Sequence, residues 1–266
     1  MVNLERDFCF CTLALGQKYR NLVKQLASDI EKYSPQTSLV ICTDLPQDFQ
    51  GISNVLAYKH SRQGVLYCYD DKRFAIQKAL TKFRAAIFVD ADTRILANVP
   101  ENIVWPPGIT CEGFVKILDH PPNQNIEGRK EAIQNLAKKL NVSLENTSWV
   151  NENLFIIARD GGKEIEFIKL WGKIGRYFEV NGVNTKDGNP IGLAAAKVGW
   201  QIKNEHWQEL DKIREHTYAH WDWDPNQVRT FWDKVDNKLQ LTKWKREYRL
   251  LKARLISLQD FNFYYR

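Results

Sequence analysis

The first hundred residues combine two patterns of apolar and polar positions. Short apolar runs bounded by turn residues predict buried strands, whereas apolar positions spaced by three and four predict helices. The expected strands are residues 8–15, 38–42, 54–58 and 85–89, and the expected helices are residues 17–32 and 72–83. Asp70 or Asp71 is expected to cap the second helix. This order is typical of an α/β protein whose mostly parallel central sheet has helices on both faces.

The second half of the chain has a less regular pattern. The expected elements are helices at residues 128–140 and 163–178 and a strand at residues 153–158. Asn189-Pro190 has the form of a helix N-cap and a first-turn proline, and Asp224-Pro225 repeats that form. We expect a single α/β domain over residues 1–224 and a helical C-terminal extension over residues 225–266.

Composition excludes several classes of protein. The chain has 266 residues, of which 44% are hydrophobic and 26% charged, as in an ordinary globular protein rather than a disordered one. No apolar stretch approaches the roughly 20 residues that a membrane span requires. Four of the five cysteines lie in or beside strand-like runs, where a thiol behaves as a small hydrophobic group. We therefore expect a reduced, cytoplasmic protein.

The pair Asp90 and Asp92 carries the clearest chemical signal. It follows the apolar strand at residues 85–89 directly, with only Ala91 between the two carboxylates. Side chains two residues apart share one side of a strand, and ligands of open α/β sheets gather at the edge where such a strand ends. Mg²⁺ or Mn²⁺, often bridging phosphate oxygens, relieves the repulsion between two close carboxylates. The alternative is that Asp90 is a turn residue at the end of the strand and that Asp92 caps the segment that follows.

Several further segments occur in a characteristic order around this pair. They are Asp71-Lys72-Arg73 at a helix start, Ile87–Asp92, Trp149–Phe155, Asp187–Pro190 and Tyr218–Trp221. Over roughly residues 8–222 this order resembles that of GT-A glycosyltransferases, which use nucleotide-diphosphate sugars. The resemblance implies a Rossmann-like GT-A domain, with a nucleotide-binding half at residues 1–100 and an acceptor half at residues 101–224. It also implies transfer of a sugar, preferably from a UDP-sugar, to a glycan or another hydroxyl acceptor.

The resemblance implies roles for residues on the donor side. The nucleotide would lie near Thr12 and Leu13, with Asp44 accepting a hydrogen bond from the base or ribose. Asp90, next to Ala91, would face the ribose or a metal-bound water. The remaining donor-side residues are Asp92 and His220 as ligands of Mn²⁺ or Mg²⁺, and Lys72 or Arg73 beside the diphosphate.

On the acceptor side, Glu152 or Asp187 would act as a base or would orient the acceptor. Which of these two roles applies decides whether the configuration of the transferred sugar is inverted or retained. Each role has a structural alternative. Lys72 and Arg73 fit the solvated first turn of a helix, and His220 fits an aromatic cluster with its tryptophan neighbours. Asp187 fits a capping turn, and Glu152 fits a polar strand edge.

Two other functions remain open. Residues 90–93 also fit the D-x-D-x-T loop of haloacid-dehalogenase-like phosphatases, in which the first aspartate is a nucleophile, although several strands precede the loop here. The net charge of +6 and the nine tryptophans also suggest a non-catalytic protein that binds a membrane surface or a nucleic acid. We expect no nucleic-acid partner.

The excess of positive charge is concentrated near the C-terminus. Six basic residues, Lys243, Lys245, Arg246, Arg249, Lys252 and Arg254, surround Trp244, Tyr248, Leu251 and Leu255. Such a basic amphipathic helix fits an anionic membrane surface, here the inner face of a membrane, or a polyanionic acceptor. The alternative is a helix that packs on the core and exposes a basic outer face.

Overall fold

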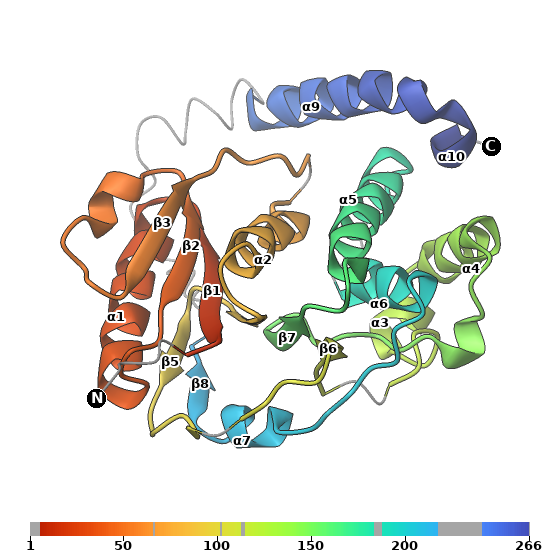
Figure 1. Ribbon diagram of the computed structural model, residues 1–266. Helices are drawn as coiled ribbons and strands as arrows, with labels where there is room; N and C mark the ends of the chain where they lie inside the picture. Colours follow the sequence, from red (N-terminus) through yellow and green to blue (C-terminus); the bar gives the residue numbers. More distant parts are fainter. Residues whose placement is uncertain are drawn as a thin grey trace.

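The computed structural model describes residues 6–65, 67–101, 103–112, 115–183, 188–217 and 241–265. Its core is a six-stranded sheet with strand order β3-β2-β1-β4-β7-β6 (Figure 1). The strands are β1 (Phe8–Ala14), β2 (Leu39–Thr43), β3 (Val55–Lys59), β4 (Ala85–Val89), β6 (Gly108–Thr110) and β7 (Leu154–Ala158). Strands β1 to β4 are parallel, and β7 runs antiparallel to both β4 and β6.

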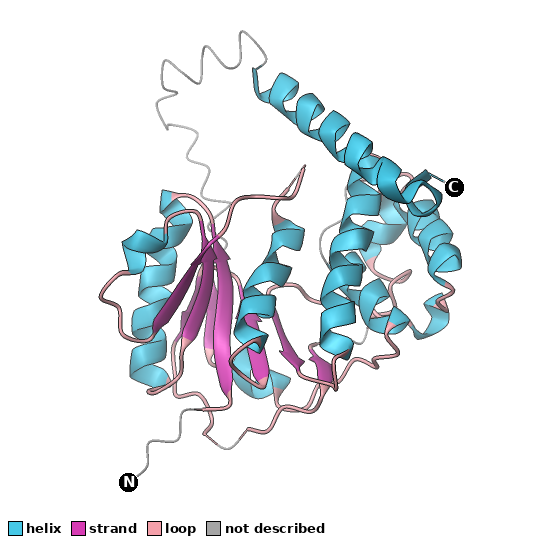
Figure 2. Cartoon of the chain, turned by 45° about the horizontal axis from the view of Figure 1, so that its top comes forward, coloured by secondary structure: helices cyan, strands magenta, loops and turns pink. Residues whose placement is uncertain are grey.

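The central strands are buried on both faces, which explains their continuous apolar sequences. Every residue of β2, β4 and β7 is buried. Figure 2 shows α1 (Gln17–Tyr33) and α2 (Lys72–Leu80) on opposite sides of the parallel strands. Right-handed crossovers require this placement, because the chain moves outward from β1 to β2 and returns from β3 to β4. The prediction of a mostly parallel α/β fold is therefore confirmed, and the fold is Rossmann-like.

The second half of the chain adds helices beside the antiparallel strands. They are α3 (Pro121–Asn125), α4 (Arg129–Leu140), α5 (Lys163–Val180), α6 (Gly188–Lys197) and α7 (Trp207–Asp211). Helix α5 packs against both α2 and α6, and therefore links the two halves of the chain. The close match between the expected and observed bounds of α4 and α5 reflects their regular apolar spacing.

A two-stranded ribbon lies outside the main sheet. It pairs β5 (Thr93–Ile95) with β8 (Arg214–His216) in antiparallel orientation, so that Thr93 faces His216. The backbone amide and the hydroxyl of Thr217 both donate to the backbone carbonyl of Asp92, at 2.9 and 2.8 Å. The sequence pattern did not predict this ribbon.

The C-terminal segment is helical, as expected. It consists of α9 (Leu241–Ser257), a 3₁₀ turn (Leu258–Asp260) and α10 (Phe261–Tyr265). Figure 1 shows α9 extending across the top of α5. The helix expected after Asp224-Pro225 lies outside the described residues. Among the described helices, none combines the length and the apolar character that a membrane crossing needs.

Candidate functional site

A cleft lies where the order of the parallel strands reverses. The chain leaves β1 toward β2 and β3, and then returns to place β4 on the other side of β1. The connections therefore diverge at the carboxyl ends of β1 and β4, which is where open α/β sheets bind ligands. A cleft of about 700 Å³ occupies this position, lined by Leu13 from β1 and by Asp90, Ala91 and Asp92 after β4.

Asp90, Asp92 and His216 form a cluster in this cleft. One potential ligand atom from each residue lies within 4.8 Å of the other two. His216 Nε2 lies 3.3 Å from Asp92 Oδ1 and 4.0 Å from Asp90 Oδ2. The side chains of Asp92 and His216 are only 6% and 8% exposed, so two acidic groups and an imidazole share a mostly dry space. Two carboxylate oxygens and one imidazole nitrogen form a donor set suited to Mn²⁺ and similar divalent cations.

The protonation of His216 is compatible with this donor set. Burial lowers the pKa of His216, and this effect outweighs the opposing attraction of Asp92 and Asp90, while Arg214 and Lys72 lower the pKa further. A neutral imidazole retains the lone pair that a metal ion requires. The cluster therefore fits a divalent cation in both charge and donor type.

The histidine in this cluster was not selected from the sequence. His220, the expected ligand, lies outside the described residues, as does Asp187. His216 reaches the aspartates because it ends β8, whose partner strand β5 begins directly after Asp92. The resemblance pointed to a histidine in this late segment, but only the pairing of β8 with β5 identifies His216 as one that reaches the aspartates.

Lys72 places a positive charge beside the cluster. Its ammonium lies 2.8 Å from Asp90 Oδ1 and donates to the backbone carbonyl of Glu152 at 3.2 Å. Because β7 is antiparallel to β4, with Val89 facing Leu154, the start of β7 lies beside the end of β4. Glu152 therefore lines the same cleft as Asp90, with 7% of its surface exposed.

Three expected donor-side residues lie elsewhere and are not among those that line the cleft. Thr12 is fully buried within β1. Asp44 accepts hydrogen bonds from the Arg20 guanidinium at 2.7 and 2.8 Å. Arg73 donates to the backbone carbonyl of Asp70 and packs against α5, where Gly172 leaves space for its guanidinium. Of the two basic residues at the start of α2, only Lys72 reaches the cleft.

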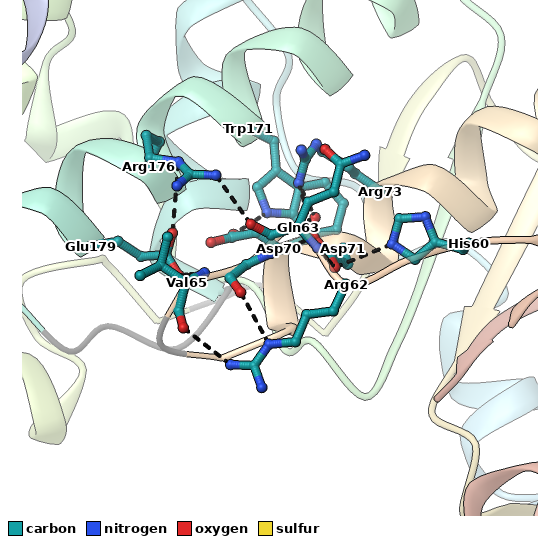
Figure 3. A network of polar contacts seen from close by, with 11 residues as sticks. His60, Arg62, Gln63, Val65, Asp70, Asp71, Arg73, Trp171, Arg176 and Glu179 are labelled. Atoms are coloured by element: carbon teal, nitrogen blue, oxygen red, sulfur yellow. Dashed lines mark hydrogen bonds and ion pairs between the residues drawn. The ribbon is translucent and has the colours of Figure 1, made fainter. Parts of the chain in front are cut away.

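The loop between β3 and α2 is organised by a fully buried carboxylate. Asp71 accepts hydrogen bonds from the backbone amides of Gln63 and Gly64 at 2.7 and 3.1 Å, and His60 Nε2 lies 3.2 Å from it (Figure 3). Asp71 occupies the N-cap position of α2 but makes no capping hydrogen bond with its side chain. The expected position of Asp71 at the N-cap of α2 is therefore confirmed, but its carboxylate binds the loop and does not cap the helix amides.

The same loop is attached to α5. The indole of Trp171 donates to Asp70 Oδ1 at 2.7 Å, and the amide of Val65 donates to Glu179 Oε1 at 2.7 Å (Figure 3). These contacts position Tyr67 and Tyr69, which line the cleft. The two rings stack with centroids 5.1 Å apart and an angle of 12° between their planes. The result is an accessible aromatic surface at the cleft.

A second aromatic pair also lines the cleft. His120 and Trp149 stack with ring centroids 4.1 Å apart and planes 9° from parallel. Asn189, expected to cap α6, lies inside that helix, and its amide exchanges two hydrogen bonds with buried Asn123 at 2.7 and 2.9 Å. This pairing fixes the wall on which Asn189 and Trp149 lie.

No protein-family model matches this chain, and no curated protein matches it in sequence. Interpretation of the cleft therefore depends on its position in the fold and on the chemistry of its side chains.

Proposed function

We propose that this protein is a metal-dependent glycosyltransferase of GT-A type, which transfers a sugar from a nucleotide-diphosphate donor to a hydroxyl acceptor. The carrying observation is the cluster of Asp90, Asp92 and His216, with Lys72 beside it, at the strand-order reversal of a parallel sheet. This combination of negative ligands and a nearby cation suits a metal–diphosphate group better than either a bare metal or a bare anion. A UDP-sugar is our preferred donor.

Asp90, Asp92 and His216 would hold the cation, and the imidazole favours Mn²⁺ over Mg²⁺. When bound, such an ion neutralises charge on a diphosphate leaving group. Lys72 contributes a second positive charge from a side chain only 9% exposed. A fixed charge in such a water-poor site acts more strongly on a developing negative charge than it would in solvent. We assign Lys72 to the diphosphate.

The two aromatic pairs divide the cleft into a nucleotide side and an acceptor side. Tyr67 and Tyr69, in the loop that leads into α2, provide a flat surface on which a base can stack. His120 and Trp149 form a flat wall in the acceptor half, suited to the apolar face of a sugar ring. We assign Glu152, which lines the same cleft and shares Lys72 as a partner with Asp90, to the acceptor hydroxyl.

The test combines a donor panel with variants of the cluster. Full-length protein is incubated with UDP- and GDP-sugars with and without Mn²⁺, and thermal shift and donor hydrolysis are measured. D92A should abolish Mn²⁺-dependent nucleotide binding, because Asp92 supplies charge as well as geometry. H216A should raise the Kd for Mn²⁺ at least about tenfold. The control is H206A, since His206 is an exposed surface histidine paired with Glu209.

The proposal fails if no nucleotide binds in the presence of metal. Hydrolysis of small phosphates by the same preparation, lost in a D90N variant, would instead favour the phosphatase alternative, in which Asp90 is the nucleophile. Equal effects of H216A and H206A on the Kd for Mn²⁺ would remove His216 from the site.

A further inference from the structure

Helix α9 carries an exposed apolar stripe. Trp244 and Tyr248 are 71% and 68% exposed, and the stripe continues through Leu251 and Leu255 to Leu258, the first residue of the 3₁₀ turn that follows α9. These positions are spaced by four, three, four and three residues, so their side chains follow one face of the helix. Five large apolar side chains aligned on one exposed face exceed the scattered exposure that is normal for a protein surface.

The opposite face of α9 attaches the helix to the domain. Leu250, Ala253 and Ser257 lie about half a turn from the stripe, and Ala253 and Ser257 are buried. Ala253 packs with Val65 and Val180 in a small apolar cluster. Further attachments are the hydrogen bond from Arg254 to the Val180 carbonyl, the ion pair of Lys173 with Asp260, and the hydrogen bonds from Lys139 to the carbonyls of Asn262 and Phe263. On α9 itself, the buried residues Ala253 and Ser257 of this attachment therefore lie on the face opposite the stripe.

The charges beside the stripe limit its partner. Helix α9 contains six lysines and arginines and a single acidic residue, Glu247. At about 100° per residue, Lys245 and Lys252 lie on one flank of the stripe, and Lys243 and Arg254 on the other. A second copy of α9 would bring these positive flanks together, and the two-heptad stripe is shorter than a stable coiled coil needs. The complementary partner is negatively charged and accepts apolar side chains.

We propose that the outer face of α9 docks on an anionic lipid bilayer. In this position Trp244 and Tyr248 enter the interface between headgroups and acyl chains, where both residue types are favoured. The flanking lysines contact the negative headgroups, and each such charge near the surface changes binding about fivefold. Docking is reversible because the stripe lies in the interface of the bilayer and does not cross its hydrocarbon core.

The attachment of α9 places this surface next to the cleft. Val65, which packs on Ala253, belongs to the loop that continues directly into the cleft-lining residues Tyr67 and Tyr69. A bilayer bound to α9 therefore lies near the loop on the nucleotide side. The docking surface itself does not depend on the reaction that the cleft performs.

Sedimentation with lipid vesicles tests the proposal. Full-length protein should sediment with phosphatidylglycerol vesicles at low salt, remain in solution with phosphatidylcholine vesicles, and be released by high salt. K245E/K252E should weaken binding at least about 25-fold. The control K130E/K169E makes the same charge change on exposed positions of α4 and α5 and should weaken binding much less.

A second pair of variants tests the apolar stripe. W244S/L251S should lose vesicle binding, whereas V104S/I165S, which alters apolar residues exposed to 71% and 55% outside α9, should keep it. Unchanged melting temperatures would establish that all variants fold. The proposal is overturned if the protein does not bind phosphatidylglycerol vesicles. It is also overturned if the control variants K130E/K169E and V104S/I165S lose as much binding as the α9 variants. Binding to polyglutamate or RNA without vesicle binding, or an α9-dependent dimer in sedimentation velocity, would also overturn it.

Discussion

Replacing Gly175 with alanine should release the cleft loop from α5. A Cβ atom at this position would lie 2.1 Å from Oδ2 and 2.4 Å from Cγ of Asp70. The Asp70 carboxylate would have to move, yet it accepts the indole hydrogen bond of fully buried Trp171 at 2.7 Å. The movement therefore breaks that bond and leaves a buried donor without its acceptor.

The expected magnitude follows from two opposing effects. Loss of a hydrogen bond between a buried donor and a charged acceptor costs about 2–3 kcal/mol of unfolding free energy. Alanine in place of glycine inside a helix recovers about 1 kcal/mol. The net destabilisation should be about 1–2 kcal/mol, which corresponds to a decrease in melting temperature of about 2–8 °C for a chain of this size.

Urea denaturation of a double-mutant cycle measures this effect. The four proteins are the wild type, G175A, D70A and the double variant, with K169A as a helix control on the exposed face of α5. In the D70A background the carboxylate is absent, so G175A should be neutral or stabilising by up to about 1 kcal/mol. An equal cost of G175A in both backgrounds would refute the reasoning, because the clash would then involve something other than Asp70.

Two further predictions concern buried polar groups. N189A should cost about 1–3 kcal/mol in urea denaturation, because it leaves buried Asn123 Oδ1 without its donor, while Asn123 Nδ2 keeps its hydrogen bond to the Ile117 carbonyl at 2.6 Å; a cost below about 0.5 kcal/mol would contradict this pairing. Burial raises the pKa of Cys9, Cys11 and Cys42, to about 12 for Cys42, from 9.0. Above pH 9 the unfolded thiols lose protons that the folded ones keep, so stability should fall with rising pH, by about 1.4 kcal/mol per pH unit for each thiol. C42A should make the dependence of the unfolding free energy on pH shallower by about 1.4 kcal/mol per pH unit between pH 9 and 12, the contribution of one proton. An unchanged dependence would exclude Cys42 as a contributor.

The parts of the fold that could be predicted are those with a long local pattern. Helix α1 was expected at residues 17–32 and spans Gln17–Tyr33, and β4 was expected and found at residues 85–89. Every position of β4 is buried, and the buried apolar positions Val23, Leu26, Ala27 and Ile30 of α1 recur at helical spacing. Strands β5 and β8 have three residues each, and each finds its partner more than a hundred residues away. Three residues contain too little alternation to identify a strand, so His216 could not be placed.

The side chains at the start of α2 show a second limit. Lys72 and Arg73 are adjacent and equally basic, but successive helical residues point about 100° apart. Lys72 consequently reaches Asp90, whereas Arg73 packs on α5 beside Gly172. Likewise, Asp71 has the ordinary sequence context of a helix cap, but the loop amides of Gln63 and Gly64 compete successfully for its carboxylate. Local sequence identifies the residue types at this site, and only the packing around them determines their partners.

Pairing of β5 with β8 also sets the order in which the cluster of Asp90, Asp92 and His216 forms during synthesis. Asp90 and Asp92 leave the ribosome early, whereas Thr217, which hydrogen-bonds to Asp92, is translated 125 residues later. During that interval the nascent chain contains the carboxylates of Asp90 and Asp92 but lacks the His216 imidazole that completes the cluster. An ion bound by all three side chains would connect the early segment that contains Asp90 and Asp92 to the late segment that contains His216. The three-residue cluster is therefore completed late, when the end of β8 reaches its place beside Asp92.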